Sequence, residues 1–193
     1  MTLGARGCIA LEVTLVGSNQ DLHSGQMGGL AYNPNRALAE LLSQLWDANG
    51  SVAVPGFYDG VVAPSVEELN NYPFSMNEET LKHEFGIDAF GNEKNRTLKE
   101  ANWFRPTLDI NGISGGYAGK GSKTVIPAQA TAKMTCRLVV GQDPEKVAHA
   151  IDRFLHSKVK KGMKVKVVQQ GGIGAYRSPS NSPLAKAVSQ RCV

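Results

Sequence analysis

The fold of this 193-residue chain begins with a strand predicted over residues 7–18, GCIALEVTLVGS. Apolar and β-branched side chains fill this stretch, which stops at a glycine and a serine, as strands commonly do. The next periodic segment predicts a helix from Asn33-Pro34 to about Asp47. Asparagine can cap a helix, proline suits its first turn, and an apolar stripe follows at helical spacing, formed by Leu38, Leu41, Leu42 and Leu45.

Four further elements are indicated by periodicity and capping. Strands are predicted over 103–113 and 124–140, which are expected to pair antiparallel, and over 164–170, after a helix that begins at Asp143-Pro144. The order strand, helix, strand, strand, helix, strand predicts an α+β fold of the ferredoxin-like βαββαβ type. This is a sandwich of a four-stranded antiparallel sheet with two helices on one face. The second strand is expected at an edge of the sheet.

A helical insertion is predicted at about residues 52–102, where a plain sandwich needs only a short loop. It contains prolines, glycines and two short acidic helices, expected over 66–71 and 77–85. A connection of this length inside a compact domain usually carries function or contacts a partner. After about residue 171 the chain runs towards a short helical stretch that starts at Leu184.

The composition is that of an ordinary globular chain, with 41% hydrophobic and 20% charged residues. It has no apolar run long enough for a membrane span and no recognisable signal peptide, so a soluble, cytoplasmic protein that binds no membrane is expected. Three cysteines, odd in number and far apart, predict reduced thiols. The net charge of +4 without a wide basic patch argues against nucleic-acid binding.

Three residues have side chains suited to a functional site. His23 lies in a loop rich in glycine and serine, where the backbone can approach a ligand closely. Arg137 lies near the end of an apolar strand, and its guanidinium suits two-point binding of a carboxylate. Thr124 begins the same predicted strand. Taken singly, they also fit a surface histidine, an internal ion pair and an ordinary strand threonine. Asp21 with His23 makes too few ligands for a metal, so no metal site is predicted in this chain.

An ordered series of motifs extends over nearly the whole chain. It comprises Leu3-Gly4-Ala5-Arg6-Gly7, Asp21-Leu22-His23-Ser24-Gly25, Gly28-Gly29, Asn33-Pro34, Asn111-Gly112-Ile113, Gly115-Gly116-Tyr117, Lys123-Thr124-Val125-Ile126-Pro127 and Arg137-Leu138-Val139. In this order the motifs resemble the lid, or dimerisation, domain of a zinc metallopeptidase family. That family contains carnosine dipeptidases, aminoacylase, succinyl-diaminopimelate desuccinylase and glutamate carboxypeptidases, and the carnosine-dipeptidase branch is the most similar.

The resemblance implies three parts. Residues 1–6 would be a strand leading in from a catalytic domain outside this sequence, residues 7–172 the lid with its insertion at 52–102, and residues 173–193 the return to that catalytic domain. The catalytic domain would bind two zinc ions, none through this chain, so the isolated chain is expected to be inactive. Lids of two subunits would form a homodimer through an edge strand and a helix.

The resemblance also implies roles for the three site residues. His23 would reach across the dimer and donate a hydrogen bond to the oxygen of the tetrahedral intermediate, where such a donor stabilises the transition state. Arg137 would bind the C-terminal carboxylate of the substrate, and Thr124 would assist in that contact. The full protein would hydrolyse a C–N amide bond in a small peptide or an acyl-amino acid.

Two other functions fit parts of the sequence. The first is a ferredoxin-like regulatory module that binds an amino acid through Arg137 and the His23 loop without catalysis. The second is a freestanding hydrolase that uses His23 with Ser24, but a serine adjacent to its histidine rarely has the required geometry. Because a lid and a regulatory module would share one fold, the fold alone does not separate them.

Overall fold

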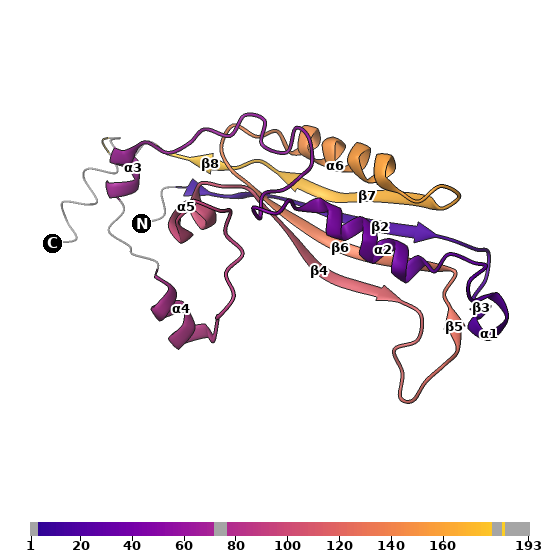
Figure 1. Cartoon of the computed structure of the whole chain (residues 1–193). Helices are drawn as coiled ribbons and strands as arrows, with labels where there is room; N and C mark the ends of the chain where they lie inside the picture. The colour runs from indigo at the N-terminus through magenta and orange to yellow at the C-terminus, as the bar shows by residue number, and fades with distance from the viewer. Residues whose placement is uncertain (1–3, 72–76, 179–182, 184–193) are drawn as a thin grey trace.

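A four-stranded antiparallel sheet forms the centre of the computed structural model, which describes residues 4–71, 77–178 and 183 (Figure 1). The strands lie in the order β4 (Thr107–Gly115), β6 (Gln129–Leu138), β2 (Gly7–Val16) and β7 (Lys164–Ile173). All neighbouring pairs run antiparallel. The α+β class and the antiparallel sheet are therefore confirmed. Of the four strands of this sheet, β4 comes second along the chain, and it lies at an edge as predicted.

Two helices cover one face of the sheet (Figure 1). They are α2 (Pro34–Leu42), which continues as a 3-10 turn, η1 (Ser43–Leu45), and α6 (Pro144–Lys158). Side-chain caps begin both helices: Asn33 accepts an N–H of the first turn of α2, and Asp143 does the same for α6. The first helix is shorter than predicted, because its last turn tightens into η1 before residue 47.

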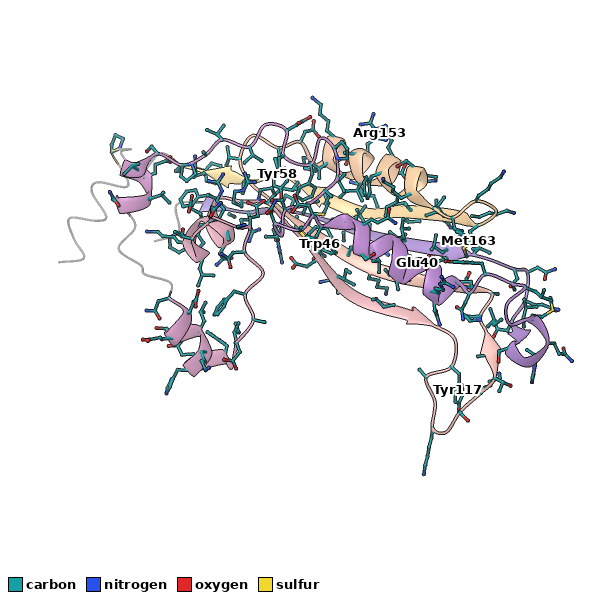
Figure 2. The ribbon with its side chains drawn as sticks, in the orientation of Figure 1. Glu40, Trp46, Tyr58, Tyr117, Arg153 and Met163 are labelled. Carbon is teal, nitrogen blue, oxygen red and sulfur yellow. The ribbon has the colours of Figure 1, made fainter. Side chains whose placement is uncertain are left out.

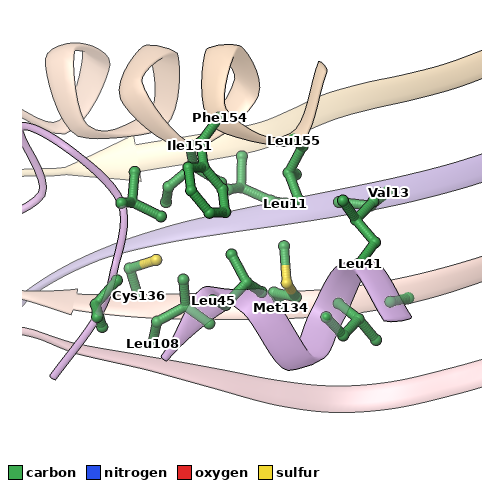
Figure 3. Close-up of a cluster of buried hydrophobic side chains, with 14 of the residues drawn as sticks. Leu11, Val13, Leu41, Leu45, Leu108, Met134, Cys136, Ile151, Phe154 and Leu155 are labelled. Carbon is green, nitrogen blue, oxygen red and sulfur yellow. The ribbon is translucent and has the colours of Figure 1, made fainter. Parts of the chain in front are cut away.

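The apolar core lies between these helices and the sheet (Figure 3). On β6 every second side chain points into it, and Met134 and Cys136 are at most 1% exposed. Facing them are leucines of α2 and η1 together with Ile151 and Leu155 of α6. Removing these apolar side chains from water is the main force that joins the two layers. We call the other face of the sheet, which α2 and α6 leave uncovered and which carries Arg137, the open face.

The strand predicted from Trp103 begins instead at Thr107, because Trp103 ends a short helix, α5 (Leu98–Trp103). A capping box starts this helix. The Thr97 hydroxyl accepts the Glu100 N–H, and the Glu100 carboxylate accepts the Thr97 N–H. Two satisfied backbone donors thus outweigh the preference of an aromatic side chain for a strand.

The strand predicted over 124–140 is divided in two. β5 (Val125–Ile126) pairs with β3 (Leu22–His23), and β6 begins only after Pro127. Proline has no N–H to donate to a strand ladder, which explains the interruption. The separate β3–β5 pair places the His23 loop beside the segment that follows Thr124, at one end of the molecule.

The insertion contains the two predicted helices, α3 (Val66–Asn71) and α4 (Glu78–Phe85). Asn77 caps α4 by accepting the Thr80 N–H. In Figure 1, α4 lies apart from the sheet, so this helix contributes little to the core.

A largely buried network joins two distant parts of the insertion to each other and to Arg105, which lies just before β4. The Glu93 carboxylate accepts from the Tyr58 hydroxyl at 2.5 Å and from two nitrogens of Arg105 at 2.6 and 2.9 Å. Tyr58, labelled in Figure 2, also accepts the Val52 N–H. Burial, helped by the hydrogen bond to Glu93, raises the pKa of Tyr58 to about 12. Burial alone would raise the pKa of Glu93, but its hydrogen bonds from Arg105 and Tyr58 lower it.

A two-stranded ribbon joins the two ends of the described fold. β1 (Gly4–Ala5) pairs antiparallel with β8 (Tyr176–Arg177). The helical stretch predicted from Leu184 lies outside the described residues. Within the described part of the chain, no helix has both the length and the apolarity needed to cross a bilayer.

Candidate functional site

His23 lies at the end of the molecule opposite the β1–β8 ribbon, where β3 leads into a one-turn helix, α1 (Ser24–Met27) (Figure 1). Its Nδ1 accepts the Gly25 N–H at 3.1 Å and so caps the helix. Its Nε2 lies 3.0 Å from Thr124 Oγ1, and the Ser24 N–H donates to the Thr124 carbonyl. Two of the three predicted site residues are thus in direct contact, through the pairing of β3 with β5.

The contacts of the imidazole define its tautomer. A backbone N–H can only donate, so Nδ1 of His23 must carry the lone pair that accepts from Gly25. The proton of the neutral ring is therefore on Nε2, which donates to Thr124 Oγ1. The local fold prepares Nε2–H as a hydrogen-bond donor.

Small residues and an aspartate hold this loop in place. The Asp21 carboxylate accepts the Ala128 N–H at 2.8 Å, which gives Asp21 a structural role. A Cβ at position 25 would lie 2.9 Å from Cε1 of His23, so Gly25 lets the ring approach the backbone. A Cβ at position 28 would lie 2.4 Å from the Ser24 carbonyl oxygen, which the Gly28 N–H contacts. Glycine is required at both positions because the His23 ring and the Ser24 carbonyl oxygen lie too close to the backbone for a Cβ atom.

Arg137 lies on the open face near the other end of the sheet. It is opposite Cys8 on β2 and opposite Thr107 on β4. Its side chain is exposed. Within residues 4–71 and 77–178 its guanidinium forms no hydrogen bond and no ion pair. The internal ion pair that the sequence left open is therefore not formed with any described residue.

The fold separates Arg137 from the other two site residues. Thr124 precedes β6, and the eight steps from Gln129 to Arg137 along β6 span roughly 26 Å at about 3.3 Å per residue. An extended dipeptide spans only about 7 Å. Within one chain, Thr124 cannot contact the same small ligand as Arg137. The expectation that Thr124 assists Arg137 can therefore be met only between two chains.

Arg6 is a residue beside Arg137 that the sequence did not single out. Its guanidinium donates to Thr107 Oγ1 at 3.1 Å and to the Arg105 carbonyl at 3.2 Å. Burial, and to a lesser extent the charge of Arg137, lowers its pKa, while Asp109 acts in the opposite direction. Arg6 occurs in one of the motifs quoted above, but no periodic pattern shows where its side chain goes.

The described residues do not offer a metal site. Among them, no group of three or more histidine, cysteine, aspartate or glutamate side chains is placed to hold an ion. His23, the histidine of the candidate site, has both ring nitrogens occupied by Gly25 and Thr124. These side chains do not fit a metal centre, so no chemical step is assigned to a metal in this chain.

Comparison with known proteins identifies the class that this fold and these motifs define. The family model of the M20 peptidase dimerisation domain, described as "Peptidase dimerisation domain", matches residues 3–163. The chain belongs to the M20 peptidase family, as its dimerisation domain.

Similar curated proteins are metallodipeptidases, which are hydrolases. The Cys-Gly metallodipeptidase DUG1 of Candida albicans is 32% identical over 165 residues, 83% of this chain and 33% of the relative. The human Beta-Ala-His dipeptidase is 33% identical over 156 residues, 80% of this chain and 31% of the relative. The chain thus spans about a third of the length of these relatives and covers only their dimerisation domain.

Solved structures of M20 family proteins have the same fold as this chain. Human carnosine dipeptidase 1 has a TM-score of 0.83 at 30% identity, covering 98% of this chain and 41% of that one. The M20 family metallo-carboxypeptidase Sso-CP2 from Sulfolobus solfataricus has a TM-score of 0.85 at 33% identity, covering 97% of this chain and 48% of that one. Their fold is therefore shared over almost the entire chain.

Proposed function

We propose that this domain joins two subunits of a dipeptidase and completes each active site with residues from two chains. The whole protein would hydrolyse the C–N amide bond of a small peptide or acyl-amino acid. The observation that supports this most directly is the separation of the His23–Thr124 pair from Arg137. One short substrate can meet all three only if His23 and Thr124 come from one subunit and Arg137 from the other.

The position of the β1–β8 ribbon supports this division of residues. A catalytic domain attached beyond the ribbon would lie near the Arg137 end of its own chain. The His23–Thr124 end points away from that attachment, towards the place that a second subunit would occupy. Arg137 would therefore act in its own subunit's site, and His23 with Thr124 in the partner's site.

His23 and Arg137 would act on different parts of the substrate. Nε2–H of His23 would turn from Thr124 Oγ1 to the oxygen that gains negative charge as the amide carbon becomes tetrahedral. A positioned donor of this kind typically contributes a few kcal/mol to transition-state stabilisation. The fork of Arg137, free of internal partners among the described residues, would hold the C-terminal carboxylate through two parallel hydrogen bonds.

The subunits would pair through β4 and the neighbouring helix α2. An edge strand exposes unpaired N–H and C=O groups, and a twofold axis lets two copies of one strand satisfy each other. β4 exposes Ile110 and Ile113 and has no lysine, whereas the other edge strand, β7, carries Lys164 and Lys166. Edge lysines prevent pairing, so β4 is the better surface for a partner.

The metallodipeptidase relatives imply a metal for the whole protein. We place it outside this chain, as two zinc ions in the catalytic domain, because the described side chains do not fit a metal centre. When bound there, zinc would polarise the amide carbonyl and activate water.

Mixed dimers test the division of residues between subunits. In the full-length enzyme, His23→Ala should lower kcat by at least about 100-fold. Arg137→Ala should mainly raise KM for substrates with a free carboxylate. When the two variants are co-expressed, random pairing gives half mixed dimers with one intact site each. At substrate concentrations well below KM, about one quarter of wild-type activity should therefore return. If both residues served the same chain's site, no mixed dimer would contain an intact site.

A matched pair of mixtures serves as the control. Thr124→Val with Arg137→Ala should restore activity, because their positions lie at different ends of the domain. Thr124→Val with His23→Ala should not, because both residues belong to one end. Recovery in the second mixture would contradict the proposed arrangement.

A further inference from the structure

Arg6 and Arg137 form a pair of like charges at one end of the open face. Arg6 precedes β2 by one residue, and its Nη2 donates to the hydroxyl of Thr107. Thr107 is directly opposite Arg137 in the β4–β6 ladder, and opposed side chains in such a ladder have Cβ atoms about 5 Å apart. The two guanidinium groups are therefore arranged around one threonine.

The contacts of Arg6 leave its charge largely uncompensated. Its three acceptors, Thr107 Oγ1, the Arg105 carbonyl and Asn102 Oδ1 at 3.4 Å, are all neutral. Its Nε is buried and has no hydrogen-bond partner among the described residues. No described carboxylate lies within ion-pair distance of either arginine.

Asp109 is a carboxylate whose charge acts on Arg6, and it is linked to Arg6 through Thr107. Its carboxylate accepts from Thr107 Oγ1 at 3.1 Å, so the Thr107 hydroxyl accepts a hydrogen bond from Arg6 and donates one to Asp109. This chain fixes the Thr107 hydroxyl and the Arg6 guanidinium together. Arg6 is thereby held in place with its charge directed at the region around Arg137.

We propose that Arg6 is a positioning residue that makes the Arg137 end of the open face selective for an anionic group, the carboxylate of the substrate. This inference rests on the proposed role of Arg137. Two neighbouring cations repel each other when the site is empty, and a carboxylate placed at Arg137 relieves that repulsion. A neutral amide in the same position relieves little of it. Arg137 thus contacts the carboxylate of the substrate, and Arg6 increases the preference for a carboxylate over a neutral amide.

The test compares two substrates in the full-length enzyme, a dipeptide with a free carboxylate and the same dipeptide with a C-terminal amide. Arg6→Gln should raise KM for the free dipeptide about tenfold, with kcat for both substrates and KM for the amide within about twofold of wild type. Arg6→Lys, which keeps the charge, should retain most of the preference. Thr107→Val, which removes the anchor of Arg6, should raise KM for the free dipeptide about threefold.

The outcomes separate this inference from the proposed function. If Arg137→Gln abolishes the preference for the carboxylate and Arg6→Gln leaves it intact, Arg137 keeps its role and the inference about Arg6 is wrong. If Arg6→Gln lowered kcat/KM equally for both substrates, or lowered only kcat, the inference about Arg6 would also be wrong. A residue with only a structural role would affect both substrates alike. If Arg137→Gln leaves the preference intact, the proposed role of Arg137 fails, and the inference with it. If the Arg6→Gln variant does not fold, Thr107→Val and Arg6→Lys provide the test, through the ratio of KM for the free dipeptide to KM for the amide.

Discussion

At the scale of single residues, the backbone around His23 does more than position the ring. The Gly25 N–H requires an acceptor at Nδ1, and this leaves Nε2 as the donor. One backbone donor thus determines both the orientation and the tautomer of the candidate catalytic group.

Replacement of Gly25 by alanine tests this role of the loop. The new methyl group would lie 2.9 Å from Cε1 of His23 and would force the ring out of its present position. Turnover of the full-length enzyme should fall about tenfold or more, because a catalytic group displaced by about 1 Å loses much of its effect. The folded state should be little affected, since the loop is exposed. Gly91→Ala is the control, because a Cβ there meets no atom within 4 Å. Equal turnover in both variants would argue against the requirement.

The three candidate site residues were predicted from the sequence, but the contact between His23 and Thr124 was not. His23 and Thr124 are 101 positions apart, and only the β3–β5 pair brings them together. Pro127 indicates in the sequence that the predicted strand is interrupted there. This interruption separates Thr124 from the strand that contains Arg137. The position of Arg6 had no such signal, because it depends on a hydrogen bond to β4.

At the scale of elements, the two edge strands differ in how readily they would pair with another strand. β7 has exposed lysines, while β4 exposes Ile113 at 63% on the side of the sheet that carries α2. Apolar surface next to unpaired backbone groups favours association with a second copy. The sequence correctly predicted β4 as an edge, since element order alone places it there. It missed α5, although the pattern T-x-x-E at residues 97–100 is a readable helix start.

A charge on β4 should disrupt the proposed dimer. Ile113→Lys would place a solvated ammonium group in the interface and should raise the dimer dissociation constant at least about tenfold. Light scattering over a concentration series would detect this as a shift from about twice the 20.7 kDa chain mass towards the chain mass itself. Val168→Lys is the matched control, an exposed apolar residue on the other edge strand. A change in mass for Val168→Lys alone would show that β7 is the pairing edge.

At the scale of the whole molecule, one network joins two distant parts of the insertion to Arg105, just before β4. Tyr58, Glu93 and Arg105 come from separate parts of the chain, and Glu93 accepts from both of the others. Arg105 also lies over the Tyr58 ring, with its central carbon 4.4 Å from the ring centroid. The sequence could not predict this network, because no local pattern links the three positions.

The network should make stability depend on pH at both extremes. Because the pKa of Glu93 is lowered in the folded state, its carboxylate stabilises the fold at pH values above 4.5, the ordinary pKa of glutamate. This contribution is lost as the pH falls below 4.5. The raised pKa of Tyr58 has the opposite sense: its contribution is complete below pH 10 and is lost as the pH rises towards about 12. Urea unfolding across pH should show both decreases, and Tyr58→Phe should reduce the alkaline one, to which the raised pKa of Cys136 also contributes.

The same measurement gives the contribution of the carboxylate. Glu93→Gln should lower the free energy of unfolding at neutral pH by about 1–3 kcal/mol, because it weakens hydrogen bonds to a charged partner. Glu84→Gln, on the exposed surface of α4, should change it by less than about 0.5 kcal/mol. Similar values for the two variants would mean that the network does not stabilise the fold.

The β1–β8 ribbon has a mechanical consequence. It is only two residue pairs long, and it lies at the end of the sheet farthest from His23. If the chain bends at the ribbon, the sheet would rotate about it as one unit. The ten residues of β2 span about 33 Å, so a rotation of about 10° at the ribbon would move the far end of the sheet by roughly 6 Å. A small adjustment where the chain passes through the ribbon would thus be enough to carry His23 into or out of hydrogen-bonding distance of a substrate.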